Sequence, residues 1–523
     1  MESLVKAVEG NGVKVLKPGD RDYEYAPRNT AQVQAVVREA KTRKRRFTIK
    51  NGGHSYAGAS TTDRGILLDL SKMKEISLDA KAEEVTLQGG ARWGHAYKAL
   101  VDANLNGWVI NGGRCPMVGV SGFILGGGLS PFTRSFGMGC DTLLEATVVT
   151  ADGKKVTVSS KDDPKRDNGK LFWALCGAGG GNFGVVVEMK MKLQKLEGKE
   201  VVAGLYVWAP KPDAMNTFMS TMVDFYTAKW PTQTTIDSSW LCALDDAKSE
   251  LRVRFPIYHN GDKAKFNATI DKYIKNRDLA KQLKLRSAAE PTLSSAAGRF
   301  RIYTSVALDN SKDTIVGVTN LIRKEMAVFR DRFTGEEGLM QVTWIHAGGK
   351  ANQKRNSTTT AFPWRTCVYH TYVMLEWKEK WLNADMEGFL KKMRTALRRF
   401  AIESRASFIN FPDRELKGYE QAYFGVNAEA LREIKKKWDP DNFFRWSQGV
   451  QLPKRAKPMV LRAAPRIAPG ENVAVLSVNE AVDVEEEEEE EKDNYVVDDV
   501  LMAAAVRNKY EGGGMLSLVD LGF

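Results

Sequence analysis

Two side chains in glycine-rich segments are suited to covalent chemistry. His54 lies in KNGGHSYAGAS (50–60), and Cys115 opens CPMVGVSGFILGGGLS (115–130). Glycine lets the backbone approach a ligand closely, and both the imidazole and the thiolate are nucleophiles. Arg114, next to Cys115, would favour the thiolate. The simpler alternatives are a histidine that hydrogen-bonds within a turn and a cysteine that packs as a small buried hydrophobe.

A third glycine-rich segment, CGAGGGNFG (176–184), contains the spacing GxGxxG from Gly179 onward. Clustered backbone N–H groups suit a pyrophosphate. A Rossmann dinucleotide site needs a strand, then the loop, then a helix. Here a helical stretch (170–176) precedes the glycines and a strand-like run (185–193) follows them. The order therefore argues against a Rossmann site.

The elements that must position these loops alternate between strand and helix over residues 13–195. Apolar spacing predicts a helix over 28–46, with Asn29 or Thr30 as its N-cap, and a second helix over 93–104. Strand patterns and one hairpin follow from alternation and turn residues. They are strands at 46–50, 65–71, 83–90 and 185–193, and a hairpin over 145–160 that turns at Asp152-Gly153.

Residues 196–401 change character. LYVWAP, SSWLCAL, LRVRFPIYH and YHTYVMLEW are strand-like, and helical stretches separate them. This mixture predicts a second domain with an antiparallel sheet covered by helices, and an α+β chain as a whole. Many aromatic residues lie on these strands, and most are expected in the core, with a few lining a pocket. They include Trp240, Trp344, Tyr369 and Tyr372.

The net charge of the 523 residues is +12, but it is divided unevenly. Residues 453–523 carry 8 Lys/Arg against 15 Asp/Glu, including seven consecutive glutamates at 485–491, so residues 1–452 carry +19. The acidic stretch is predicted to be a mostly disordered tail. The basic body suits an anionic cofactor or substrate, or is a basic surface without a specific partner. KTRKRR (41–46) stands without a recognised nucleic-acid motif, so no nucleic-acid partner is expected.

Targeting and metal signals are weak. No apolar run is long enough for a membrane span, and no signal-peptide pattern precedes the first strand, which predicts a cytoplasmic protein without a membrane partner. The five cysteines are scattered and are expected to be reduced. The histidines have no metal-ligand spacing, so no metal is expected.

Five segments in chain order resemble one flavoprotein family. They are IKNGGHSYAG, RCPMVGVSGFILGGG, LFWALCGAGGGNFGVVVEM, TAFPWRTCVYHTYVMLEW and NFPDRELKGYEQAYFGVNAEALREIKKKWDPDNFF. They are similar to the vanillyl-alcohol oxidase / p-cresol methylhydroxylase family, and within it to the berberine bridge enzyme-like oxidases. The resemblance covers roughly residues 5–452. It implies a two-part FAD-binding domain of the p-cresol methylhydroxylase type (1–195 and 402–452) around a substrate-binding domain (196–401), with the acidic tail (453–523) outside.

The resemblance implies FAD as the cofactor, held by two covalent bonds. His54 matches the histidine bonded to the flavin 8α-methyl, and Cys115 matches the cysteine bonded to flavin C6. The matched segments give the full set of expected cofactor-binding residues. They are Asn51, Gly52, Gly53, His54, Ser55, Tyr56, Cys115, Val118, Gly119, Ser121, Gly122, Gly126, Gly127, Gly128, Val185 and Asn410.

The implied reaction is an oxidation of a small-molecule substrate. Hydride leaves an alcohol carbon of a carbohydrate or secondary metabolite for flavin N5, and the reduced flavin is reoxidised by O₂ to give H₂O₂. In the family, a small residue three positions after the cysteine leaves room for O₂. That residue is Val118, which favours an oxidase over a dehydrogenase.

The catalytic base departs from the family pattern. Two tyrosine positions of the C-terminal segment are Phe408 and Phe411, which cannot exchange a proton. Either another residue acts as base, or the protein is a catalytically impaired flavin-binding scaffold. The candidates by residue type are Tyr56, Tyr372 and Tyr423, followed by Glu376 and His370.

Two further departures concern the substrate and the adenine end of the site. Trp364 stands in AFPWR where family members often have histidine, and it either stacks on a substrate ring or packs in the core. The connection YEYAPRN (23–29) between the first strand and the helix after it is shorter than usual.

Overall fold

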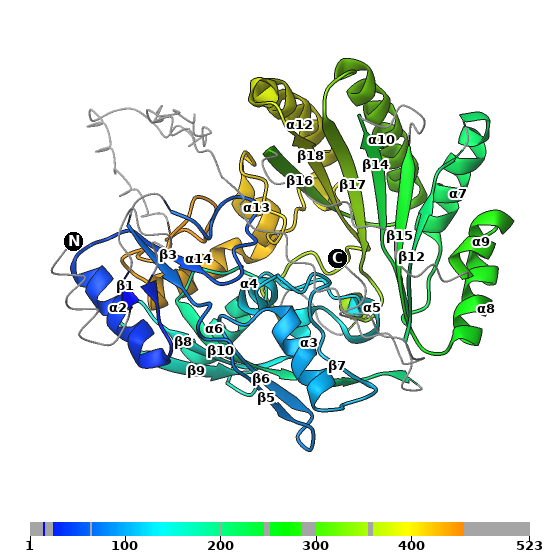
Figure 1. Cartoon of the computed structure of the whole chain (residues 1–523). Helices are drawn as coiled ribbons and strands as arrows, with labels where there is room; N and C mark the ends of the chain where they lie inside the picture. Colours follow the sequence, from blue (N-terminus) through cyan, green and yellow to red (C-terminus); the bar gives the residue numbers. More distant parts are fainter. Residues whose placement is uncertain are drawn as a thin grey trace, which may run out of the picture.

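The computed structural model describes residues 14–15, 25–62, 65–197, 201–210, 212–244, 251–284, 300–353 and 359–453 (Figure 1). The predicted disordered tail lies outside these residues except for residue 453. Among the described residues, no helix has the length and apolarity that crossing a bilayer requires.

The first sheet begins the N-terminal region. Its strand order is β1 (Lys14–Val15), β2 (Tyr25–Ala26), β4 (Ile66–Asp69) and β3 (Phe47–Lys50). Helix α2 (Thr30–Thr42) begins where Asn29 Oδ1 accepts a hydrogen bond from the Gln32 N–H at 3.0 Å, which confirms Asn29 as the predicted N-cap. The apolar face of α2 packs on the sheet through Val33, Val36 and Val37.

A second sheet of antiparallel neighbours forms the base of this region. Its order is β5 (Ile76–Asp79), β6 (Glu84–Gln88), β10 (Val185–Lys192), β8 (Leu143–Val149) and β9 (Lys155–Ser159). The predicted hairpin is confirmed, because β8 pairs with β9 around Asp152 and Gly153. Gly153 has φ +75°, a conformation that glycine adopts without strain.

Short helices alternate with the glycine-rich loops above the second sheet. They are α3 (Trp93–Asp102), α4 (Val120–Leu125), α5 (Thr133–Phe136) and α6 (Asp167–Leu175), with the small strand pair β7 (Trp108–Val109) and β11 (Gln194–Lys195). The glycines from Gly179 lie between α6 and β10, so the helix-before-loop order is confirmed and the Rossmann arrangement is absent there.

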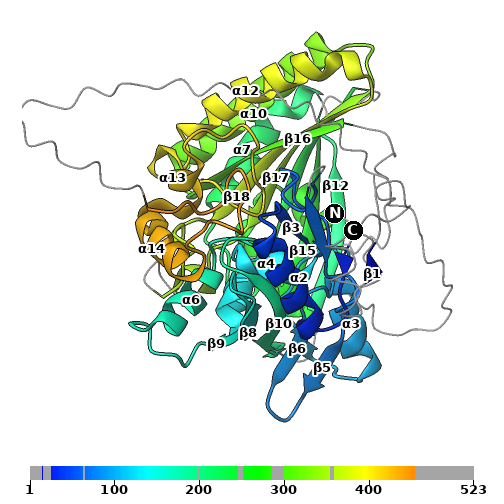
Figure 2. The same ribbon diagram turned by 90° about the vertical axis from the view of Figure 1, so that its left-hand side faces the viewer.

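The large sheet is antiparallel and helices cover one of its faces, as predicted (Figures 1 and 2). Its order is β12 (Val201–Trp208), β15 (Arg252–Asn260), β14 (Ser238–Ala243), β17 (Gly338–His346), β18 (Tyr369–Trp377) and β16 (Phe300–Leu308), with β13 (Thr234–Ile236) also paired to β15. The helices are α7 (Met215–Thr227), α8 (Lys263–Tyr273), α9 (Arg277–Lys284), α10 (Lys312–Arg332) and α12 (Asn383–Arg398), and α11 (Lys350–Gln353) follows β17.

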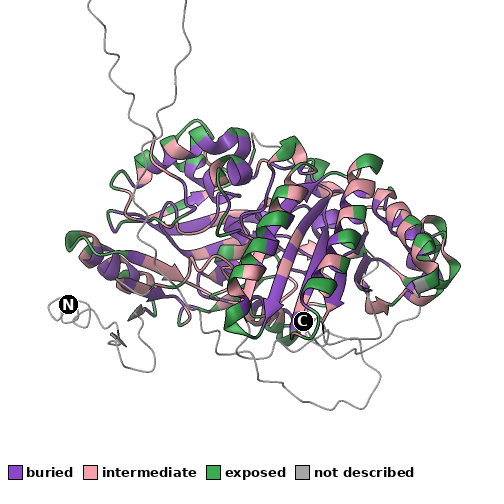
Figure 3. Cartoon of the chain, turned by 90° about the horizontal axis from the view of Figure 1, so that it is seen from above, coloured by how far each residue is buried: buried purple, intermediate pink, exposed green. Residues whose placement is uncertain are grey.

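The two faces of the large sheet have different neighbours. On β18, Tyr369 contacts Tyr226 of α7, whereas Tyr372 contacts Tyr56 of the N-terminal region. Because successive residues of a strand point to opposite faces, the even-numbered residues of β18 face the N-terminal region. Figure 3 shows the buried strands beneath helices whose outer sides are exposed. The predicted core residues Trp240, Trp344 and Tyr369 are fully buried.

A buried guanidinium joins the N-terminal region to the large sheet. Arg134 of α5 donates to the carbonyl oxygens of Trp230, Thr234 and Ala347 at 2.6, 2.8 and 2.6 Å. Burial lowers the pKa of Arg134 to about 10, so the side chain stays charged at neutral pH. The carbonyl oxygens therefore compensate a charge that is costly to bury.

The C-terminal segment packs back on the N-terminal region. It contains α13 (Tyr419–Phe424) and α14 (Ala428–Trp438). Lys435 of α14 is buried; its ammonium group pairs with Asp439 at 2.6 Å and donates to the Asn182 carbonyl at 2.7 Å. Through Lys435 the C-terminal segment is thus hydrogen-bonded to the N-terminal region.

Candidate functional site

The first two glycine-rich loops meet. Asn51 Nδ2 donates to Ser121 Oγ at 2.7 Å and to the Gly89 carbonyl at 2.5 Å. A Cβ at Gly52 would lie 2.5 Å from Gly119 N, and a Cβ at Gly119 would lie 2.5 Å from Asn51 Cγ. The two loops are therefore packed backbone against backbone, which only glycine permits at these positions.

The loop that carries Cys115 is fixed from its other side by α3. The N–H groups of Trp93 and Gly94 donate to the carbonyl oxygens of Val118 and Pro116 at 3.1 and 2.8 Å. The third glycine segment braces α4, because Gly179 N–H donates to the Leu125 carbonyl at 2.8 Å. The second and third glycine segments are thus held by backbone hydrogen bonds as well as by the core residues that they contain, such as Ile124 and Phe183.

The end of α4 meets the C-terminal segment. Asn410 Nδ2 donates to the Phe123 carbonyl at 2.9 Å, and a Cβ at Gly126 would lie 1.9 Å from Asn410 Oδ1. Gly127 and Gly128 have φ +113° and +78°. Three of the expected cofactor-binding residues, Gly126, Gly127 and Asn410, therefore come together here. Val185, another member of that set, is the first residue of β10.

These loops fit a bound FAD. The side-chain amide oxygen Oδ1 of Asn51 is buried between them and has no hydrogen-bond partner in the structure. A buried polar atom without a partner costs free energy, so a ligand donor at this place would be stabilising. A Cβ added at Gly122 would meet no atom within 4 Å, so there is open space beside Gly122. A Cβ added at Gly119 would meet Asn51.

His54 and Cys115 are both partly buried in these loops, and Cys115 is a free thiol. The Arg114 guanidinium hydrogen-bonds groups other than the thiol. Its guanidinium forms two hydrogen bonds to Asp237, at 2.5 and 3.0 Å, and a third to the Leu129 carbonyl. The structure therefore pairs Arg114 with Asp237, and the effect of Arg114 on the Cys115 thiol stays a prediction.

An aromatic cluster lies over the His54 loop. Tyr56 stacks on Tyr303 of β16, with ring centroids 3.9 Å apart and planes at 11°. Tyr56 also contacts Phe411 and Tyr372, at 5.8 and 6.5 Å between centroids. Burial raises the pKa of Tyr56 well above its ordinary value, and the neighbouring Tyr372, Tyr303 and Cys115 raise it further.

Tyr372 adds a polar group to this cluster. Burial raises the pKa of Tyr372, while hydrogen bonding with Thr343 and the charge of Arg254 lower it. Gln341 Nε2 donates to Thr343 Oγ1 at 2.8 Å, and Gln341 also hydrogen-bonds Tyr372. Phe411 packs on the Tyr372 ring, with centroids 4.8 Å apart.

Tyr423 does not join this cluster. Its hydroxyl accepts from the Asp413 N–H at 3.0 Å and donates to Gln448 Oε1 at 3.2 Å. Its ring contacts are with Tyr419 and Phe424, and burial raises the pKa of Tyr423. The structure therefore gives Tyr423 a role inside the C-terminal segment rather than beside Tyr56 and Tyr372.

The two remaining candidates for the catalytic base are Glu376, which is in an ion pair, and His370, which is uncharged. Glu376 pairs with Arg301 at 2.6 Å. His370 is buried against Phe408, with centroids 4.8 Å apart, and burial lowers the pKa of His370 to about 3. His370 is therefore uncharged at neutral pH.

Trp364 is buried, and its indole N–H donates to the Ala422 carbonyl at 2.7 Å. Of the two expectations for Trp364, packing is the one that this geometry supports. The polar tip and the apolar body of the indole are both used within the protein.

Sequence reasoning missed Tyr303 and Asp237. Tyr303 lies on β16, and Asp237 lies between β13 and β14, so both belong to runs that read like any half-buried strand. Only the pairing of β16 with β18, which places Tyr303 opposite Met374 and next to the Tyr372 row, brings Tyr303 to Tyr56. No local motif marks either residue.

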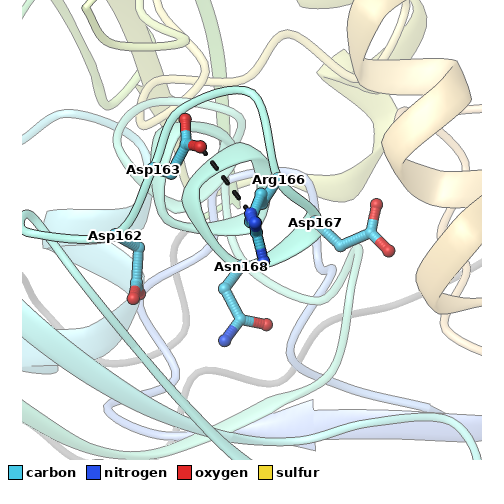
Figure 4. A pocket seen from close by; sticks show the side chains of 5 residues that line it. All are labelled: Asp162, Asp163, Arg166, Asp167 and Asn168. Carbon is cyan, nitrogen blue, oxygen red and sulfur yellow. Dashed lines mark ion pairs between the residues drawn. The ribbon is translucent and has the colours of Figure 1, made fainter.

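A separate surface pocket of about 460 Å³ lies between β9 and α6 (Figure 4). It is lined by Asp162, Asp163, Arg166, Asp167 and Asn168. None of these belongs to the glycine loops or the tyrosine cluster, so this pocket is not the candidate site. Among the described residues, no group of three His, Cys, Asp or Glu side chains could hold a metal ion.

Comparisons with known proteins agree with this geometry. Residues 22–159 match the FAD binding domain family, and residues 407–451 match the berberine and berberine-like family. Monolignol oxidoreductase AtBBE-like 13 of Arabidopsis thaliana is 27% identical over 489 residues, covering 86% of this chain and 87% of the relative.

Solved structures share the fold. Berberine bridge enzyme from Eschscholzia californica has a TM-score of 0.70 at 18% identity, covering 87% of this chain and 100% of the other. Xylooligosaccharide oxidase from Myceliophthora thermophila in complex with xylobiose has a TM-score of 0.69 at 20% identity, covering 86% and 100%.

The fold and the glycine loops thus define an FAD-linked oxidoreductase. Along most of its length the chain is similar to the berberine bridge enzyme-like members of these flavoproteins.

Proposed function

We propose that this chain is an FAD-dependent oxidase whose flavin is bonded to both His54 and Cys115. One observation carries the proposal: the loops of these two residues meet, through the Asn51–Ser121 hydrogen bond and the close approach of Gly52 and Gly119. We infer that the flavin ring lies where these two loops meet, within reach of both nucleophilic side chains. The similarity to this family supports FAD as the group held there.

The residues that would hold the cofactor come from four segments. Asn51, Gly52 and Gly53 would face it from the first loop, with Ser55 beside them, and Val118, Gly119, Ser121 and Gly122 from the second, with Gly126 to Gly128, Val185 and Asn410 completing the cradle. When bound, FAD would accept hydride from the substrate and pass the electrons to O₂, giving H₂O₂.

Tyr372 is the proton acceptor that the geometry favours. It hydrogen-bonds Thr343, and the nearby charge of Arg254 favours its ionised form. Oxidation of an alcohol breaks a C–H bond, whose electron pair leaves as hydride, and an O–H bond, whose proton goes to the Tyr372 oxygen. The ionised fraction of Tyr372 grows as the pH rises. Because burial raises the pKa of Tyr372, this growth falls in the alkaline range. Turnover should rise in parallel.

The substrate class follows from the proteins that share the fold. The solved relative holds xylobiose, and the plant relative is named for monolignols. We therefore propose a carbohydrate or a secondary metabolite with an oxidisable alcohol. Val118 is a small residue in the Cys115 loop. It favours reaction of the reduced flavin with O₂, and therefore an oxidase over a dehydrogenase.

A second candidate is a flavin-binding scaffold without turnover. Phe408 and Phe411 favour it, because neither can exchange a proton and Phe411 lies directly on Tyr56 and Tyr372. Anaerobic mixing of the yellow protein with sugars and aromatic alcohols separates the candidates. Bleaching of the flavin by any of them rejects the scaffold, and peroxide formation in air then supports the oxidase. A flavin that no member of the panel bleaches rejects the oxidase for these substrate classes.

A further inference from the structure

One row of residues crosses the large sheet on the face toward the N-terminal region. The strand pairings place its members directly opposite one another. From β12 to β16 they are Val207, Arg254, Ser239, Thr343, Tyr372 and Ser305. Tyr372 contacts Tyr56 and Phe411, so the row faces the aromatic cluster and the C-terminal segment.

Most polar members of this row are satisfied within the protein. Ser239 Oγ and Thr343 Oγ1 are 2.9 Å apart, and Tyr372 hydrogen-bonds Thr343. At the end of the row, Ser305 Oγ donates to the Phe411 carbonyl at 2.9 Å. Arg254 differs, because its Nε is buried and has no hydrogen-bond partner in the structure.

The carboxylate whose charge reaches this row, Asp237, is paired with another arginine. Asp237 receives two hydrogen bonds from Arg114 and one from the His346 N–H at 2.9 Å. Arg254 forms no ion pair with any residue that the structure describes, yet its charge reaches Tyr372 and Tyr258.

A partly buried arginine without a carboxylate partner costs free energy. A partly buried guanidinium loses water contacts, and its planar fork is best compensated by a carboxylate that accepts two hydrogen bonds. Its backbone lies on β15, paired with β12 on one side and β14 on the other, rather than on a loop. Its neighbours in the row already satisfy one another, so they do not compensate its charge.

We propose that Arg254 binds a carboxylate of the substrate, so that this enzyme prefers an alcohol that is also an organic acid. The inference rests on the proposed oxidase function and narrows its substrate class to anionic sugars or aromatic acids. Tyr372, in the same row, would then meet the alcohol end of the molecule. The polar groups between them, Ser239 and Thr343, would face the substrate body.

Binding of carboxylates to the full-length, flavin-loaded protein tests this proposal. The probes are 4-methylbenzoate and D-glucuronate, each compared with its methyl ester by isothermal titration calorimetry without O₂. A charge-assisted hydrogen bond changes affinity by roughly 10- to 100-fold. We expect at least one acid to bind more tightly than its ester by about this factor, and Arg254→Gln to remove the difference while ester binding stays the same.

Three variants distinguish the specific site from a basic surface. Arg254→Lys should keep part of the preference, since it keeps the charge and loses the fork. Arg252→Gln removes an exposed charge two residues along the same face and should keep all of it. Equal losses in Arg252→Gln and Arg254→Gln, or no preference for either acid in the wild-type protein, would overturn the proposal. So would loss of flavin from folded Arg254→Gln, which would make Arg254 a cofactor ligand.

Turnover separates failure of this inference from failure of the oxidase proposal. Peroxide formation is measured with 4-(hydroxymethyl)benzoate and with its methyl ester. If both are oxidised at equal efficiency, the function stands and the carboxylate inference fails. If neither bleaches the flavin while acid binding depends on Arg254, the inference about binding stands and the oxidase proposal fails for this class.

Discussion

The ring of Tyr56 stacks on the ring of Tyr303, with centroids 3.9 Å apart. Tyr56 follows His54 by two residues in the first glycine loop, and Tyr303 lies on β16 of the large sheet. The position of the proposed flavin attachment is therefore coupled to the domain that we propose binds substrate. Stacked aromatic pairs contribute about 0.5–1.5 kcal/mol beyond the area that they bury.

Replacing Tyr303 tests this coupling. Tyr303→Ala should lower the free energy of unfolding by at least the roughly 1 kcal/mol of the ring pair and slow the covalent attachment of flavin at His54. Tyr303→Phe keeps the stacked ring and should behave like the wild type. Denaturant unfolding and the fraction of acid-stable flavin measure the two effects. Identical behaviour of the Ala and Phe variants would show that the stack does not position the loop.

The close approach of the glycine loops gives a second prediction. Gly119→Ala places a Cβ 2.5 Å from Asn51 Cγ, so the loops must separate and flavin content should fall strongly. Gly388→Ala is the matched control, since a Cβ there meets nothing within 4 Å and the residue lies within α12. The control should be neutral or gain up to about 1 kcal/mol from helix propensity. Normal flavin content in Gly119→Ala would contradict the packed-loop site.

The proposed proton acceptor predicts a pH dependence. Because burial raises the pKa of Tyr372, turnover of the wild type should rise with pH through the alkaline range. Tyr372→Phe should lose about 100-fold or more in turnover together with that rise. Steady-state peroxide assays from pH 6 to 10 measure both.

Tyr423→Phe is the control for this experiment. It removes a buried hydroxyl that bonds Asp413 and Gln448, so it should cost about 1–3 kcal/mol of stability and leave the shape of the pH profile unchanged. A pH profile that Tyr372→Phe leaves intact would remove Tyr372 as the acceptor.

Buried His370 predicts an acid-sensitive stability. Burial lowers the pKa of His370 to about 3, below the roughly 6.5 of an unfolded histidine. The unfolded chain therefore binds this proton first, and stability falls as the pH drops from about 6.5 toward 3. At pH 5 this amounts to about 2 kcal/mol.

His370→Phe keeps a ring beside Phe362 and Phe408 and removes the titrating group. The loss of unfolding free energy between pH 7.5 and pH 5 should be smaller in this variant than in the wild type by about 2 kcal/mol. Chemical denaturation at both pH values gives the comparison. Equal losses in the two proteins would show that His370 is not neutral in the folded state.

The sequence predicts the local parts of this molecule well. The Asn29 cap, the hairpin at Asp152-Gly153 and the helix-loop-strand order around Gly179 follow from short-range rules, and the structure confirms them. The glycine loops identify the family because a close approach of backbones leaves few alternatives to glycine. They also limit where FAD can lie.

The sequence does not predict what depends on strand pairing. Arg114 looks like a partner for the adjacent Cys115, and only tertiary structure shows that it pairs with Asp237. Tyr423 is equivalent to Tyr372 by residue type, yet its hydroxyl is used inside the C-terminal segment. Arg254 becomes distinctive only because its neighbours across the sheet satisfy one another and leave its Nε without a partner.

The double attachment of FAD is tested most directly by the intact mass of the acid-denatured protein. The wild type and the single variants His54→Ala and Cys115→Ala should each retain the mass of one FAD, and the double variant should lose it. Peptide mapping of the wild type should place the flavin on one cross-linked species that contains both His54 and Cys115. A denatured, flavin-supplied wild-type protein with the bare polypeptide mass would contradict the account.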